Sequence, residues 1–186
     1  MDYRSNIDRM DYAGSGLSYN QLLDVWFNED SGAPVEPVTL SEAKLFCRID
    51  VSDDDATIES LITTARQMCE DFTNIGFISR NVVAIINNGN GGSYLPYGPI
   101  WDIISVTDVK GTLVTAEIQG VVWKQVLTPR SERLTIEYNA GHETLPAKLK
   151  TAMLNAIMYL YDNRSQGAET IGPIATMLLT PIRRIW

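Results

Sequence analysis

The segment from Ser52 to Asn74 has the longest uninterrupted helical pattern in the chain, and it constrains the fold more than any other segment. Its apolar residues fall on one stripe at the 3.6-residue helical period. The stripe comprises Ile58, Leu61, Ile62, Ala65, Met68, Cys69 and Phe72. The opposite side is polar and comprises Asp54, Asp55, Glu59, Thr63, Arg66, Gln67, Glu70 and Asp71. A helix with one apolar face needs a partner that covers this face.

Local signals predict where this helix begins and ends. Ser52 is a suitable N-cap, and the next three residues are aspartates, which lie where the helix dipole favours negative charge. Gly76 stands just beyond the last apolar residue, where a left-handed glycine commonly ends a helix.

A second long helix is predicted from Pro146 to Asn163, and it is the natural partner of the first. Proline is favoured at the first helical position. Its apolar stripe comprises Leu149, Ala152, Met153, Ala156, Ile157, Leu160 and Tyr161. The two helices are similarly one-sided, so we expect them to pack antiparallel.

Shorter elements complete the expected fold. Thr39 and Glu42 form a capping-box pattern before a short helix, and Ile174 to Leu179 predicts a last one. Runs rich in β-branched residues predict short strands between about residues 80 and 138. The predicted fold class is α+β, a helical core of two long antiparallel helices plus short helices, with a small antiparallel β insertion.

Residues 1–36 differ in composition from the rest of the chain and are interpreted as an N-terminal arm. The piece SYNQLLDVWFNED suggests a short helix capped by Ser18. Its apolar anchors are Leu22, Leu23, Trp26 and Phe27. These residues either pack on their own domain or bind a neighbouring protein, because exposed aromatic side chains are good anchors for a partner surface.

Residues 181–186 form a C-terminal tail that combines apolar side chains with two guanidiniums. Its members are Pro181, Ile182, Arg183, Arg184, Ile185 and Trp186. Leaving such apolar side chains in water is unfavourable. The tail therefore packs on its own domain or binds another subunit or partner.

Composition argues against several kinds of function. The net charge of −8 disfavours tight non-specific DNA binding, which needs clustered Lys and Arg. No apolar run approaches the roughly 20 residues of a transmembrane helix, and we expect no membrane association. The two cysteines, Cys47 and Cys69, are expected to be reduced, buried thiols of a protein made in the cytoplasm.

No catalytic, cofactor or metal site is predicted. His142 is the single histidine, and a hydrolase that uses it with Cys47 or a serine is the least favoured function. Asp53, Asp54 and Asp55 do not complete a calcium loop, and the glycines of residues 87–93 match no phosphate-binding motif.

Several short motifs, in this order, resemble the tailed-phage head–tail connector family, also called adaptor or head-completion proteins. They run over about residues 37–184. The matching residues are Leu40, Glu42, Ala43 and Lys44; Asp53 to Asp55; Phe72 and Thr73; Leu95 to Pro99; Tyr138 to Gly141 with Leu145 and Pro146; Tyr161 to Arg164; and Leu178 to Arg183. Residues 1–36 have no counterpart in the family pattern.

The resemblance implies a non-enzymatic structural protein of the virion neck, with residues 37–180 as the connector domain. It implies a homo-oligomeric ring, commonly a dodecamer, under the portal protein. The ring continues the DNA channel without specific DNA binding and carries the next neck or tail component. It also implies that residues 181–186 dock on the portal. The alternative is another neck or tail-completion protein that binds the tail side.

Overall fold

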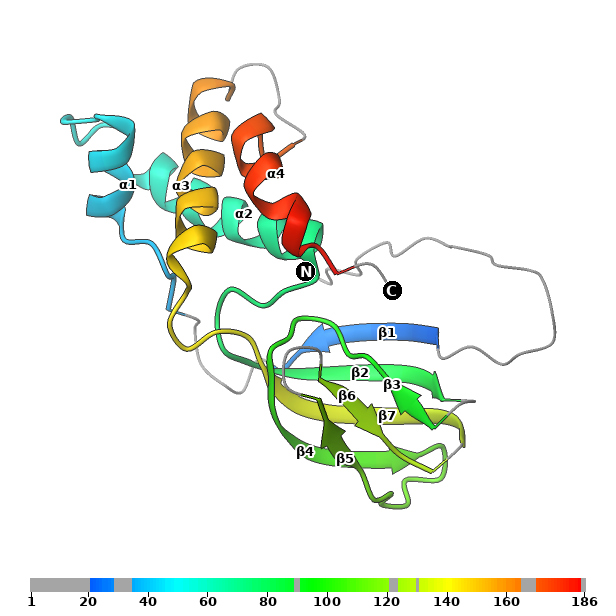
Figure 1. Cartoon of the computed structure of the whole chain (residues 1–186). Helices are drawn as coiled ribbons and strands as arrows, with labels where there is room; N and C mark the ends of the chain where they lie inside the picture. Colours follow the sequence, from blue (N-terminus) through cyan, green and yellow to red (C-terminus); the bar gives the residue numbers. More distant parts are fainter. Residues whose placement is uncertain are drawn as a thin grey trace.

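The computed structural model describes residues 21–28, 35–88, 91–120, 124–129, 131–164 and 170–184. Figure 1 shows helices gathered at one end of the molecule and strands at the other. Three connections join these parts, and the structure describes two of them throughout, from α2 to β2 and from β7 to α3. The third runs from β1 to α1. None of the helices within these ranges is long and apolar enough to cross a membrane.

The helical part is built around two long helices that pack on each other. Tyr161, near the end of one, donates a hydrogen bond to Asp54 at the start of the other. The helices are α1 (Leu40–Cys47), α2 (Asp55–Thr73), α3 (Ala147–Asp162) and α4 (Pro173–Leu179), and a short 3-10 turn (Thr180–Ile182) comes after α4.

The strands form two antiparallel sheets that enclose a second core (Figure 1). The larger sheet has the order β1-β2-β7-β4, and the smaller has the order β3-β6-β5. Their bounds are β1 (Gln21–Phe27), β2 (Arg80–Asn88), β3 (Gly92–Ser93), β4 (Ile100–Asp108), β5 (Glu117–Gln119), β6 (Gln125–Leu127) and β7 (Ser131–Ala140).

Each part has its own hydrophobic core. The helical core contains the α2 and α3 stripes, including Ile58, Ile62, Met153 and Ile157. The β core is formed by alternate residues of the strands, including Val82, Ile86, Leu134, Ile136 and Tyr138. Because strand side chains alternate between faces, every second residue of β2 and β7 enters this core.

The prediction of a helical core with a small β insertion is therefore wrong. The strands form a four-stranded and a three-stranded sheet around an independent core, which makes the β part a structural unit comparable to the helices. One of its strands, β1, also precedes every helix in the described chain. The sequence pattern does not reveal this because strand pairing is set by partners far apart in the chain.

The predicted helix around Leu22 to Phe27 is also wrong, because this segment is strand β1 and pairs with β2. The predicted cap, Ser18, lies outside the described residues. A β-bulge between Leu22 and Asp24 shifts the alternation by one residue. Leu22 and Val25 therefore contact the same core at a spacing of three, which imitates the period of a helix.

The structure confirms the predicted cap of α1 and corrects both predicted ends of α2. The Thr39–Glu42 capping box is confirmed, with the Glu42 N–H donating to Thr39 Oγ1 at 3.2 Å. For α2, the N-cap is Asp54 rather than Ser52, and Asn74 takes the left-handed conformation predicted for Gly76. Gly76 instead allows the backbone at Tyr97 to approach closely. A Cβ added at Gly76 would lie only 2.6 Å from the Tyr97 carbonyl oxygen.

Candidate functional site: the helix–sheet junction and the chain ends

The α2–β2 and β7–α3 connections are hydrogen-bonded to each other. The backbone N–H of His142, in the β7–α3 connection, donates to the Gly76 carbonyl at 3.2 Å. The His142 Nδ1 atom also lies 2.8 Å from this carbonyl. On the other side, the Gly76 N–H donates to Gly98 at 3.0 Å. The junction is therefore a crossing of three chain segments held by backbone hydrogen bonds.

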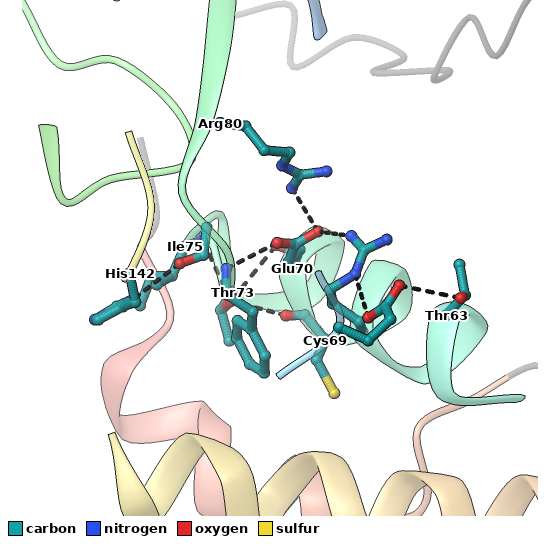
Figure 2. Close-up of polar contacts among 11 residues, drawn as sticks. Thr63, Cys69, Glu70, Thr73, Ile75, Arg80 and His142 are labelled. Carbon is teal, nitrogen blue, oxygen red and sulfur yellow. Dashed lines mark hydrogen bonds and ion pairs between the residues drawn. The ribbon is translucent and has the colours of Figure 1, made fainter. Parts of the chain in front are cut away.

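A buried ionic network reinforces this junction (Figure 2). The Glu70 carboxylate accepts hydrogen bonds from Arg66 Nη1 at 2.7 Å, Arg80 Nη2 at 2.6 Å and the Phe77 N–H at 2.7 Å. Arg66 Nε donates to Glu36 at 2.8 Å. Glu70 and Arg66 are each only 2% exposed. The network thus joins α2, strand β2 and the segment before α1.

The charges of this network compensate one another. Burial alone would lower the pKa of Arg66, but Glu36 and Glu70 outweigh it and raise this pKa. Burial lowers the pKa of Arg80, although Glu70 opposes this effect. Breaking such a network by removing one partner is costly, because it leaves an uncompensated buried charge.

The sequence placed Arg66 and Glu70 on the polar side of their helix and so missed their burial. Their spacing of four residues is a signal for a helical ion pair, but such pairs are usually exposed. The turn into β2 brings Phe77 and Arg80 back to Glu70 at the end of α2, and Arg66 bonds to Glu36 in the segment before α1.

The residues weighed for catalysis make structural contacts. His142 Nδ1 lies 2.8 Å from the Gly76 carbonyl oxygen. Burial raises the pKa of Cys47, the cysteine weighed as its partner, which makes this thiol a poorer nucleophile. The acidic start of α2 is used in packing, since Asp55 pairs with Lys44 and Asp54 accepts from Tyr161. In the described part of the chain, no group of three or more His, Cys, Asp or Glu is arranged to hold a metal ion.

The predicted N-terminal anchors divide between the two faces of strand β1. Leu22 and Phe27 contact the β core, and the Arg80 guanidinium lies 3.7 Å from the centroid of the Phe27 ring. Leu23 and Trp26 remain 45% and 43% exposed. Two of the four predicted residues thus face away from the β core.

The C-terminal tail contacts the end of α2 in the same chain. The Arg184 N–H donates to the Thr73 carbonyl at 2.9 Å, and Asn74 Nδ2 donates to the Arg184 carbonyl at 3.0 Å. The Arg183 guanidinium lies 4.9 Å from the Phe72 ring centroid. Burial lowers the pKa of Arg184. Ile185 and Trp186 lie outside the described residues.

Comparison with known proteins identifies the family. A model of the head completion protein family matches residues 36–178, which include all four helices except the last residue of α4, and all strands except β1. This match confirms the resemblance drawn from the short motifs. No curated protein matches the sequence.

Solved structures share the fold. A chain in the neck of an empty gene transfer agent particle, computed with C6 symmetry, is 20% identical with a TM-score of 0.68. The match covers 87% of this chain and 96% of that chain. A chain of the native gene transfer agent virion is 22% identical with a TM-score of 0.68, covering 86% of this chain and 96% of that one. A chain of the native neck computed with C12 symmetry is 20% identical, has a TM-score of 0.57, and covers 83% and 95%.

The family match spans most of the chain and includes both the helical and the β part. The chain therefore belongs to the head completion protein family, and it is a structural protein of the head–tail junction of a virion.

Proposed function

We propose that this protein forms a ring in the neck of a virion, between the portal and the next neck or tail component. The observation that carries the proposal is the head completion family match over residues 36–178. The fold similarity to chains from neck structures computed with C6 and C12 symmetry supports a ring, and twelve subunits is the expected number. The net charge of −8 suits a channel through which DNA passes without binding.

The C-terminal tail is the proposed portal contact. Arg184, the last tail residue that the structure describes, is held at the end of α2 by hydrogen bonds to Thr73 and Asn74. Ile174 and Met177, one helical turn apart on α4, are exposed and lie shortly before the tail in the chain. Exposed apolar side chains in this arrangement are suited to a protein interface.

The exposed face of β1 is the proposed contact with a second protein. Leu23 and Trp26 supply apolar surface there, while Leu22 and Phe27 hold the strand on its own domain. This arrangement separates two tasks, since the tail would bind the portal and β1 would bind another neck component.

Removing only Ile185 and Trp186 tests the portal contact. Because Arg184 is retained, the shortened chain should keep the melting temperature of the full chain. We expect its affinity for purified portal to fall by about 30-fold or more, as is common when interface anchors worth about 2 kcal/mol are lost. Binding is measured by co-sedimentation, and the complexes are imaged by electron microscopy.

The matched control is the L23S/W26S double variant, which also loses an exposed tryptophan but should bind the portal normally. Full portal affinity of the shortened chain would rule out the tail as the portal contact. If the full-length protein binds purified tails and not the portal, the adaptor proposal itself is wrong.

A further inference from the structure

A polar pocket lies on the outer face of the larger sheet, next to the junction. Its volume is about 380 Å³, and it is lined by Ser79, Arg80, Asn81, Trp101, Asp102, Asn139 and Glu143. These residues come from the beginnings of β2 and β4, the end of β7 and the connection to α3. Neither the proposed portal contact nor the exposed face of β1 includes this pocket.

Asn81, in the lining of this pocket, has one amide acceptor without a donor. Its Nδ2 donates to Glu137 Oε1 at 3.1 Å, and a carboxylate can only accept, so the amide oxygen must point elsewhere. This oxygen is buried and receives no hydrogen bond from any described residue. A buried acceptor without a donor is unfavourable, so a ligand that donates there gains free energy.

The Trp101 ring provides a fixed aromatic surface beside this acceptor. Its Nε1 donates to the Gly141 carbonyl at 2.5 Å, which holds the indole in one orientation. The side chain nevertheless remains 48% exposed. An exposed indole face attracts cations, and it binds planar guanidiniums especially well.

The charges around the pocket favour a cationic ligand. Asp102 and Glu143 are exposed, and neither carboxylate has an ion pair within the described ranges. The Arg80 guanidinium contacts Glu70 and the Phe27 ring, on the core side of the sheet. Among the described residues, Lys124 is also nearby: its Nζ donates to the Ile100 carbonyl and lies 5.9 Å from the Trp101 ring centroid.

We propose that this pocket binds an arginine side chain presented by a neighbouring protein of the particle. The guanidinium would stack on Trp101, donate to Asn81 Oδ1, and pair with Asp102 and Glu143. An arginine has enough donors for these three acceptors and the planar shape that the indole surface requires. The negative net charge of the chain is consistent with a basic partner.

The direct test uses ¹⁵N-labelled full-length protein and N-acetyl-L-arginine amide as the probe. We expect a saturable shift of the Trp101 indole N–H resonance, which is assigned by its loss in a W101F variant. N-acetyl-L-citrulline amide is the matched probe, because it is neutral and nearly the same shape. Its affinity should be lower by about tenfold or more, since it lacks the charge–charge and cation–π terms.

The D102N/E143Q variant should weaken arginine-amide binding by about tenfold. The E59Q/E117Q variant is its control, because it removes two exposed carboxylates elsewhere and changes net charge equally. Equal affinity for the arginine and citrulline probes, no saturable shift, or undiminished binding to D102N/E143Q would overturn the proposal.

A sedimentation experiment distinguishes the possible donors of the arginine. If D102N/E143Q self-associates less than E59Q/E117Q, the arginine belongs to a second copy of this chain. If the two variants self-associate equally, a different protein supplies it. Both results retain the arginine pocket, and both can be obtained whether or not the ring binds the portal.

Discussion

The E70A variant is expected to lose about 3–5 kcal/mol of unfolding free energy, the usual cost of removing one partner from a buried ion network. Arg66 is almost fully buried and would lose a partner at 2.7 Å, while Arg80 and the Phe77 N–H would lose theirs as well. The measurement is urea unfolding monitored by circular dichroism.

The control for this prediction is E59A, which changes an exposed glutamate on the same helix. We expect E59A to remain within about 0.5 kcal/mol of the unsubstituted protein, as is typical of surface changes. The difference in unfolding free energy between E70A and E59A should persist in high salt, because salt screens buried ion pairs only weakly. If E70A unfolds at the same urea concentration as E59A, the network does not stabilise the junction.

The G141A variant is expected to be destabilised by roughly 3–5 kcal/mol, from backbone strain and overpacking together. Gly141 has a φ of +103°, which side chains rarely adopt, and an added Cβ would lie 1.9 Å from the Ile78 carbonyl oxygen. That oxygen belongs to the backbone, so no side-chain rotation relieves the clash. The Gly141 N–H also donates to the Pro99 carbonyl oxygen at 2.9 Å, and this hydrogen bond connects the start of β4 to the junction.

Gly111 offers a matched control, because it too has a positive φ, +78°, but an added Cβ there meets nothing within 4 Å. The unfolding free energy of the G111A variant should fall by only about 1 kcal/mol, the cost of the left-handed backbone conformation. Thermal unfolding of both variants therefore separates the cost of the positive φ, which both share, from the cost of the steric clash, which only G141A has. Equal melting temperatures for G141A and G111A would contradict the close packing of the two connections.

The long helices were predictable because their stripes are local. The apolar spacing of α2 and α3 requires only that one face be covered, and both faces are buried in the helical core. The extent of the β part was not predictable in this way. Its core depends on β1 reaching β2 from before the helices, and a bulge at Leu22 to Asp24 gives β1 the apparent period of a helix.

The junction and the pocket depend on contacts between distant residues. Glu70 resembles any exposed residue on the polar side of a helix until the chain turns and brings Phe77 and Arg80 to it. Asn81 and Trp101 likewise meet only through pairing of β2 and β4 with β7. The family could be identified from short motifs, but these residues needed the fold.

Particles made without this chain test its structural role at the head–tail junction most directly. We predict that such particles accumulate as heads without tails. Adding the purified protein to these heads, together with free tails, should restore tailed particles in electron micrographs. Normally tailed particles in the absence of the chain would contradict a role at the head–tail junction.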